Sequence, residues 1–257
     1  MSAISIRDLS FNYSMAQVFN GLNLEIKKDS FTTILGSAGT GKSTLFKILH
    51  DDFKYGGKIL MLNKSINYSI SKNYVNYISS DIFDFNKRVV IDEFINILKL
   101  KGKTDDKVKI EIDRVSRKLD IKDLLNLKIK DLSYENKLLV MFAIALLGKP
   151  KIIIIDNVFN HLGFKKKIVL QEILKLNRKK TTIVNITNNS EESLYGDDVI
   201  ILNDDKHYNI LDIDEDFFTT RNLEAPFMIS LSSKLKVYNL IDKNCLNMEK
   251  LVDDLWQ

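Results

Sequence analysis

The sequence contains few of the residues that cross-link chains, bind structural metals or interrupt helices. It has one cysteine, three histidines and two prolines among 257 residues. The single cysteine, Cys245, excludes an internal disulfide framework and is typical of a protein in a reducing cytosol. The histidines show no metal-ligand spacing, so we interpret them as incidental. Only Pro150 and Pro226 interrupt the chain, and we find no internal repeat or low-complexity linker.

Long hydrophobic runs are also absent. The longest apolar run, Leu138–Leu147, is far shorter than the roughly 20 residues that a membrane-spanning helix needs. Residues Met1–Ser10 alternate polar and apolar side chains, so we expect no signal peptide. Any work at a membrane is therefore expected to be done through a partner.

A strong charge of either sign is missing as well. Lysine and arginine number 38 against 34 aspartates and glutamates, an excess too small to predict a nucleic-acid partner. The runs Lys165–Lys167 and Arg178–Lys180 could form a basic patch, but solvated helix faces explain them better. Apolar residues make up 45% of the chain, which is typical of a globular protein with one large domain or a domain and a small appendage.

Short predicted strands alternate with helices along most of the chain. Alternating apolar residues predict two strands before residue 27, and apolar runs predict buried strands at Phe31–Leu35 and Ile152–Ile155. Helical spacing dominates from Val90 to about Leu147. The remaining predicted elements are strands at Lys58–Leu62, Val75–Ser79, Thr182–Ile186 and Val199–Leu202 and a helix at Lys166–Leu176. This order predicts an α/β fold whose mainly parallel sheet is covered by helices on both faces.

A glycine-rich motif follows the predicted strand Phe31–Leu35. It matches the phosphate-loop pattern G-x-x-x-x-G-K-[ST]. Its glycines let successive N–H groups point at phosphate oxygens, and the helix that follows adds its dipole. We expect Lys42 to reach the β- and γ-phosphates and Ser43 to bind Mg²⁺. The candidate ATP-binding residues are Gly36, Ser37, Ala38, Gly39, Thr40, Gly41, Lys42, Ser43 and Thr44.

An acidic residue ends the apolar strand Ile152–Ile155. An acid in this place beside a phosphate loop contributes to the coordination of the nucleotide-bound Mg²⁺. Asp156 is therefore the second candidate metal residue beside Ser43.

With these motifs in place, the sequence resembles the ABC transporter ATPases over essentially its whole length. The segment Leu9–Tyr13 is similar to the opening strand of that family and puts Tyr13 in the place of the aromatic residue that stacks on adenine. A plain surface or core aromatic is the alternative for Tyr13. The resemblance implies an ABC-type nucleotide-binding domain over residues 1–205. Its expected parts are an N-terminal antiparallel β part and a helical subdomain inserted at about 86–147.

The sequence departs from the pattern of that family at the positions that bind the attacking water and accept its proton. Ser80 stands where the family has a glutamine that touches the metal and the attacking water. Asn157 replaces the glutamate that acts as general base, and Asn188 replaces the switch histidine. A neutral amide can orient water but cannot take its proton, and loss of a general base costs about 10²–10⁴-fold in rate. The resemblance implies that these three degenerate catalytic positions leave hydrolysis by the chain alone weak or absent.

Two loops depart from the family as well. The signature loop, L-S-G-G-Q in the family, keeps Ser133 as a nucleotide-binding residue but has Tyr134 and Glu135 in place of both glycines. We expect Tyr134 to hinder the approach of the nucleotide and Glu135 to repel its phosphates. The loop S-x-L-D of the family reads Asn160–Gly163 here.

The resemblance also implies partners. ABC ATPases bind two nucleotides at a dimer interface, each between the phosphate loop of one subunit and the signature loop of the other. A homodimer would combine every defect at both sites, so a heterodimer with a second, intact ABC ATPase subunit is favoured. An integral-membrane transporter subunit is the other expected partner, which would place the chain peripherally at the cytoplasmic face of the membrane. Ile82, Phe83 and Phe85 are candidates to receive a helix of that subunit, with burial in the core as the alternative.

Residues 206–257 are expected to form two or three short helices, with Asn247 as the N-cap of the last one. This arrangement is similar to the C-terminal dimerisation region of the energy-coupling factor ATPases, which power vitamin and metal-ion uptake. A generic helical tail that packs on the core is the alternative. For the whole chain, the alternatives to a transport subunit are an ATP-dependent regulatory or structural protein and a different P-loop enzyme such as a small-molecule kinase.

Overall fold

The structure is a computed structural model, and it describes residues 1–257 except 15, 82–84, 86, 203, 205 and 257. The strands are β1 (Ser2–Tyr13), β2 (Ala16–Lys27), β3 (Phe31–Leu35), β4 (Gly56–Met61), β5 (Val75–Ser79), β6 (Ile152–Asp156), β7 (Thr182–Thr187), β8 (Asp198–Ile201) and β9 (His207–Asn209). The α-helices are α1 (Lys42–Leu49), α2 (Ile66–Ser71), α3 (Val90–Leu100), α4 (Asp105–Lys118), α5 (Tyr134–Gly148), α6 (Phe164–Asn177), α7 (Glu215–Thr219), α8 (Phe227–Val237) and α9 (Met248–Leu255). Short 3-10 helices lie at Lys122–Leu124, Ile129–Asp131, Phe159–His161 and Ser190–Tyr195.

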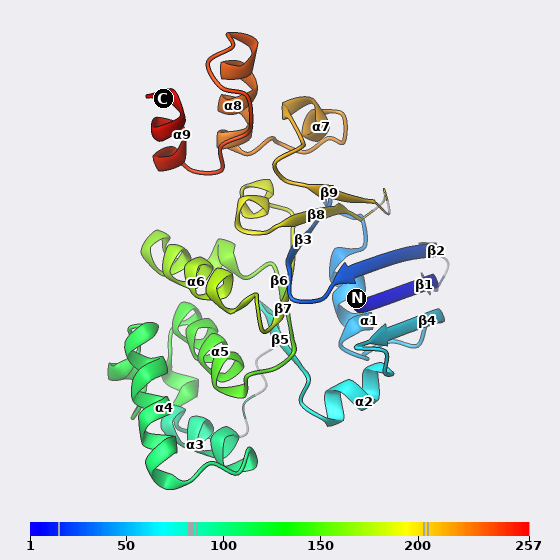
Figure 1. The fold of residues 1–257 in the computed structure, drawn as a ribbon. Helices are drawn as coiled ribbons and strands as arrows, with labels where there is room; N and C mark the ends of the chain where they lie inside the picture. Colours follow the sequence, from blue (N-terminus) through cyan, green and yellow to red (C-terminus); the bar gives the residue numbers. More distant parts are fainter. Residues whose placement is uncertain (15, 82–84, 86, 203, 205, 257) are drawn as a thin grey trace.

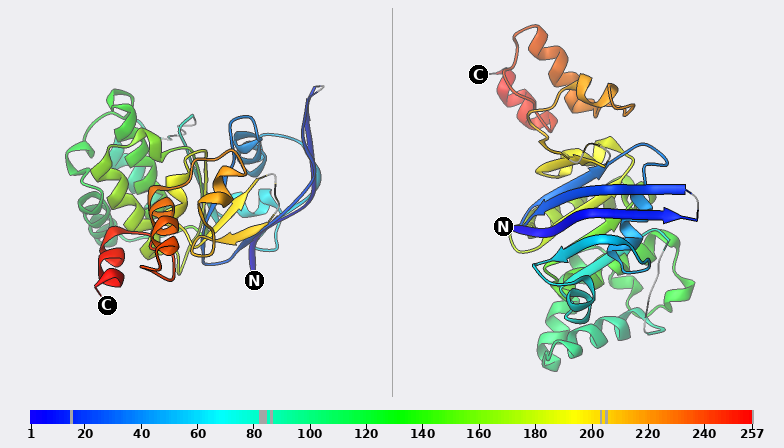
Figure 2. Two further views of the ribbon diagram at one scale, coloured as in Figure 1. Left: turned by 90° about the horizontal axis from the view of Figure 1, so that it is seen from above. Right: turned by 90° about the vertical axis from the view of Figure 1, so that its right-hand side faces the viewer.

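The N-terminal strands form an antiparallel sheet of their own. Its order is β2-β1-β4, and the long strands β1 and β2 run along one side of the molecule (Figure 2). Apolar residues of β1 pair with apolar residues of β2, as in Ile4 opposite Ile26 and Ile6 opposite Leu24. The alternation in the sequence predicted this half-buried sheet, and the prediction is confirmed.

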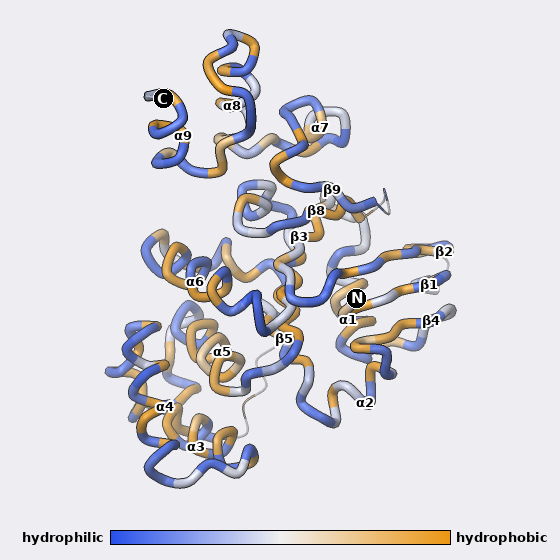
Figure 3. The backbone as a smooth tube through the Cα atoms, viewed as in Figure 1, coloured by the Kyte–Doolittle hydropathy of each residue, from blue (hydrophilic) through white to orange (hydrophobic). Residues whose placement is uncertain are grey.

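The central sheet has the order β5-β6-β7-β3-β8-β9, with β5, β6, β7, β3 and β8 parallel (Figure 1). Alternate side chains of β6 face opposite cores. Ile153 and Ile155 pack with α3, α5 and α6, while Ile152 and Ile154 pack with α1 and the N-terminal sheet. The central strands accordingly lie in the hydrophobic middle of the molecule (Figure 3). The predicted α/β fold, with a mainly parallel sheet that is covered on both faces, is confirmed.

Three details differ from the predicted elements. Leu124 ends a 3-10 helix of three residues rather than lying on an α-helix. The short helix α2 was not predicted; its N-cap is Ser65, whose hydroxyl accepts the Tyr68 N–H at 3.3 Å. The antiparallel edge strand β9 was not predicted either, since three polar or aromatic residues give no alternation to detect. The sheet therefore extends into the region beyond residue 206 where only helices were expected.

The C-terminal helices pack on the β8–β9 end of the sheet, at the top of Figure 1. A third core cluster joins Leu35 of β3 and Val199 of β8 to Phe218 of α7 and Ile229 of α8. The predicted cap of α9 is confirmed, because the Asn247 Oδ1 atom accepts the Lys250 N–H at 2.9 Å. Within the described residues, none of the helices has the length and apolar character needed to cross a membrane.

Candidate functional site

The phosphate loop connects β3 to α1 and depends on glycine at its last turn. Gly41, the residue before α1, has φ +94°, in the left-handed region that side chains disfavour. A Cβ atom there would lie 2.7 Å from the Val18 side chain on β2. The chain can therefore enter α1 at this angle only with glycine at position 41.

Lys42 lies inside the loop that precedes it. Its ammonium donates hydrogen bonds to the carbonyl oxygens of Gly36 at 2.8 Å and Ser37 at 2.7 Å. Burial lowers the pKa of Lys42, and the nearby Asp156 carboxylate opposes that shift. The lysine thus holds the loop curved, with its charge at the centre.

Asp156 ends β6 beside the phosphate loop. It is only 6% exposed, and burial raises its pKa to about 6, with a further contribution from the Asp81 carboxylate. The Lys42 and Lys47 ammonium groups reduce the shift. A divalent cation bound to this carboxylate would stabilise its charged form and so provide the acid with a reason to ionise at neutral pH.

Asp156, Lys42 and Ser43 line one cavity of about 440 Å³ at the carboxyl ends of the parallel strands. This volume is within the range of small-molecule and cofactor sites. Within the described residues, no group of three or more His, Cys, Asp or Glu side chains gathers to hold a metal. The Ser43 hydroxyl and the Asp156 carboxylate are suited to bind Mg²⁺ that enters together with a nucleotide. Phosphate oxygens and water would then supply its other ligands.

Tyr13 lies at the mouth of this cavity. The residue is 41% exposed, and its ring packs edge-on against Phe11 at 4.9 Å and Phe53 at 5.5 Å between centroids. The Thr44 hydroxyl donates a hydrogen bond to the Tyr13 oxygen at 3.4 Å. An exposed ring held in place in this way could stack on a flat base.

Amide side chains occupy the part of the rim that follows β6 and β7. Asn157 has φ +51°, and its backbone N–H donates to the Ile186 carbonyl at 2.9 Å. Its side-chain oxygen accepts from the Asn160 amide at 3.1 Å, and the Asn160 oxygen accepts from Asn189 at 3.0 Å. Asn188 is exposed on the same rim. Among the described residues that line the cavity, Asp156 alone carries a carboxylate.

The structure brings most of the predicted residues together at this cavity, and it places others elsewhere. Gly36, Ser37 and Thr40 border a smaller neighbouring cavity of about 200 Å³. Val18 and Thr187 also line the main cavity but were not predicted. Thr187 directly follows the predicted strand Thr182–Ile186, so its position was a usable signal. The predicted residues that line the main cavity are Tyr13, Ala38, Gly39, Gly41, Lys42, Ser43, Thr44, Asp156, Asn157 and Asn188.

The signature-like loop lies apart from the cavity and is bound within the chain. Ser133 caps α5, where its hydroxyl accepts the Asn136 N–H at 3.2 Å. The Tyr134 hydroxyl donates to the carbonyl oxygen of Ser80, and its ring meets that of His161 at 5.2 Å between centroids. Ser80 itself is buried and does not line the cavity.

Glu135 is held by groups at the start of α6. Its carboxylate accepts the Gly163 N–H at 2.7 Å and pairs with the Lys166 ammonium at 2.9 Å. These two contacts lower the pKa of Glu135. Lys166 compensates part of the negative charge, which reduces the phosphate repulsion that the sequence predicted. Neither contact was predicted, because the partners are about thirty residues apart in the chain.

Comparison with known proteins gives a family and several relatives. The family described as ABC transporter matches residues 19–160, more than half of the chain. The chain is 28% identical to the energy-coupling factor transporter ATP-binding protein EcfA of Malacoplasma penetrans, over 98% of this chain and 93% of the relative. It is 30% identical to the spermidine/putrescine import ATP-binding protein PotA of Clostridioides difficile, over 77% of this chain and 58% of the relative. The solved structure of cbiO1 from Clostridium perfringens, described as part of the ABC transporter complex cbiONQ, has a TM-score of 0.64 at 24% identity, over 80% and 87% of the two chains.

Proposed function

The chain belongs to the ABC transporter family of ATP-binding proteins, and on that premise we propose that it binds Mg-ATP as a subunit of a membrane importer of the energy-coupling factor type. Its own hydrolytic site is impaired in this proposal. The observation that carries it is one cavity that combines Lys42, Ser43 and their neighbours in the phosphate loop with amides where a proton acceptor would be needed. Such a site can bind the nucleotide and order water, but Asn157 and Asn188 cannot accept a proton.

The proposed type of importer rests on how much of each relative's length the chain matches. The EcfA relative is matched over nearly its whole length, including the C-terminal region, whereas the chain spans 58% of the length of the PotA relative. This difference supports a vitamin or metal ion as the solute more than a polyamine. The region 206–257 is accordingly proposed as the dimerisation region that follows the nucleotide-binding domain over 1–205.

A second ATPase subunit is part of the proposal. Ser133 does not line the cavity of its own chain, so a nucleotide bound at Lys42 would need the signature loop of another subunit to complete its site. A heterodimer is preferred because an intact partner would separate the defective groups into different sites. An integral-membrane subunit would then localise the pair at the cytoplasmic face. The predicted contact residues Ile82 and Phe83 for that subunit lie outside the described residues.

The first test is binding and turnover of Mg-ATP by the purified chain. We expect saturable binding, with turnover far below the roughly 1–10³ s⁻¹ of typical enzymes. Lys42→Ala should abolish binding, while Lys58→Ala, which removes an exposed lysine of β4, should leave it unchanged. Turnover in the typical range by the unmodified chain would refute the impaired site.

The second test restores a carboxylate at position 157. Asn157→Glu should raise turnover at least about tenfold, a fraction of what a general base contributes. The control is Asn239→Glu, because Asn239 is exposed and has φ +56°, similar to Asn157. Both variants then carry the same backbone strain from a left-handed glutamate. Equal turnover in the two variants would show that the missing carboxylate at position 157 does not limit hydrolysis.

The transport role is tested by isolation from the native cells in mild detergent. Recovery of an integral-membrane protein and a second ABC ATPase with the chain is the expected result. Recovery of the chain alone, with Mg-ATP binding intact, would favour an ATP-dependent regulatory or structural protein.

A further inference from the structure

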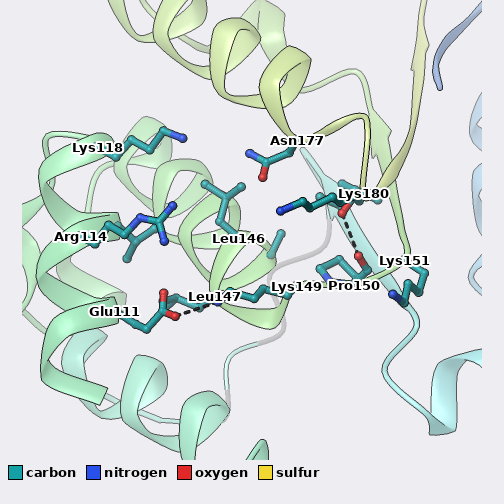
Figure 4. Close-up of a pocket in the computed structure, with 14 residues that line it drawn as sticks. Glu111, Arg114, Lys118, Leu146, Leu147, Lys149, Pro150, Lys151, Asn177 and Lys180 are labelled. Carbon is teal, nitrogen blue, oxygen red and sulfur yellow. Dashed lines mark hydrogen bonds and ion pairs between the residues drawn. The ribbon is translucent and has the colours of Figure 1, made fainter. Parts of the chain in front are cut away.

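A second cavity, of about 350 Å³, lies at the opposite end of the central sheet (Figure 4). It is bounded by α4, by the end of α5, by the start of β6 and by the segment that leads from α6 into β7. The parallel strand β6 begins beside this cavity and ends at Asp156. Five residues of strand span roughly 15 Å, so a ligand in this cavity would be separate from a nucleotide at Lys42.

The lining of this cavity is strongly cationic. Arg114 and Lys118, one turn apart on α4, extend into it from one side, and the Lys180 ammonium points toward them from the other (Figure 4). Lys149 and Lys151 complete the five cationic side chains. Because these residues come from three separate parts of the chain, the fold and not a single charged helix face brings them together.

Most of this charge has no ion-pair partner among the residues that the structure describes. Glu111 is the one acidic residue that lines the cavity among the described residues, and it pairs with Lys149 at 2.7 Å. Within the described part of the chain, no ion pair joins Arg114, Lys118 or Lys180 to a carboxylate. Burial and the neighbouring Arg114 guanidinium both lower the pKa of Lys118.

Helix dipoles compensate only part of the excess. The carboxyl ends of α4, α5 and α6 all lie near the cavity, and each contributes about half a negative charge. Four cationic side chains remain after the Lys149–Glu111 pair is removed, so the cavity stays positive.

We propose that this cavity binds a small, multiply charged phosphate compound. Arginine and lysine are the side chains that bind phosphate, and the Arg114 guanidinium can donate two parallel hydrogen bonds to it. The Asn177 amide faces the same space from the end of α6, and Leu146 and Leu147 form an apolar wall (Figure 4). The volume of the cavity is at the lower limit of sites for small molecules, which suits a compact ligand with two or three phosphates.

The test uses inorganic tripolyphosphate as the probe, titrated calorimetrically without Mg²⁺ at about 0.1 M salt, where exposed charges are largely screened. The protein carries Lys42→Ala, so that the phosphate loop contributes little. We expect one saturable site per chain. The double substitution Arg114→Ala/Lys118→Ala should weaken binding at least tenfold.

The matched control is Arg117→Ala/Lys122→Ala. It removes the same charge near the end of α4, but both residues pair with Asp113 outside the cavity, at 2.9 Å and 2.8 Å. This control should bind within about twofold of the parent. Lys180→Ala, on the opposite wall, should also weaken binding, and it provides an independent variant if the α4 substitutions disturb folding. Absence of saturable binding in the parent, or equal losses in the control and the α4 variant, would overturn the proposal.

Discussion

The buried acid at the end of β6 makes a prediction about stability that depends on pH. The pKa of Asp156 rises from 3.8 to about 6 in the folded chain. Because each pKa unit corresponds to 1.36 kcal/mol, the charged carboxylate destabilises the nucleotide-free fold by about 3 kcal/mol. The sign follows from protonation. Below pH 3.8 the acid is protonated in both the folded and the unfolded state, so it does not change the stability. The destabilisation grows as the pH rises from 3.8 to 6, and it is complete above pH 6.

Asp156→Asn should therefore stabilise the nucleotide-free protein above pH 6. The gain in stability is at most about 3 kcal/mol, and it is smaller if the buried amide lacks a hydrogen-bond partner. It should vanish near pH 4. At roughly 2–4 °C per kcal/mol for a chain of this size, the melting temperature should rise by several degrees at pH 8. The same variant should lose the stabilisation that the parent gains from Mg-ATP, because it has lost a charge that faces the metal.

The assay is thermal and urea unfolding of both proteins between pH 4 and pH 8 without nucleotide or Mg²⁺. The control is Asp198→Asn, since Asp198 is also buried but pairs with Lys27 at 3.0 Å. Removing its charge breaks that pair and should destabilise the fold. A loss of stability in Asp156→Asn at pH 8, or a gain that does not change with pH, would refute the reasoning.

Three further predictions concern packing and local contacts. Phe94→Ala on α3 removes a fully buried ring from the core that Ile153 and Ile155 share with α3, α5 and α6. It should cost about 3–5 kcal/mol, measured as a lower urea midpoint at unchanged slope. Glu135→Ala removes the acceptor of the Gly163 N–H and should cost about 1 kcal/mol, whereas Glu172→Ala, an exposed acid of α6, should be neutral in the same melts. Asn247→Ala should cost about 1 kcal/mol and speed amide exchange in α9 before any other helix; a uniform change would contradict a capping role.

The nucleotide cavity was predictable because its main parts are local in sequence. Lys42 and Ser43 belong to a loop with a recognisable pattern, and Asp156 follows an unmistakable buried strand. Since parallel strands end at the same edge of a sheet, these residues had to meet. The geometry adds the hydrogen bonds of Lys42 to Gly36 and Ser37, which no pattern specifies.

Contacts between distant loops were not predictable from the sequence. The bonds that join Asn160 to Asn157 and Asn189, and Glu135 to Lys166, depend on how whole elements pack. The run Arg178–Lys180 was interpreted as a solvated face. Lys180 is exposed, as that interpretation expects, but it also lines the cationic cavity with residues from α4. That convergence was not predicted, because tertiary packing and not local spacing determines which charges meet.

The third core cluster determines how short a functional fragment of this protein can be. Its members come from both sides of the boundary expected after residue 205, with Leu35 and Val199 in the central sheet and Phe218 and Ile229 in the C-terminal helices. A fragment that ended at residue 205 would expose those sheet residues to water, at about 25 cal/mol for each Å² of apolar surface. Expression of the nucleotide-binding part alone should therefore give an aggregation-prone product. For the same reason, a gene that lost its last fifty codons would have to replace several sheet residues with polar ones to keep a soluble protein.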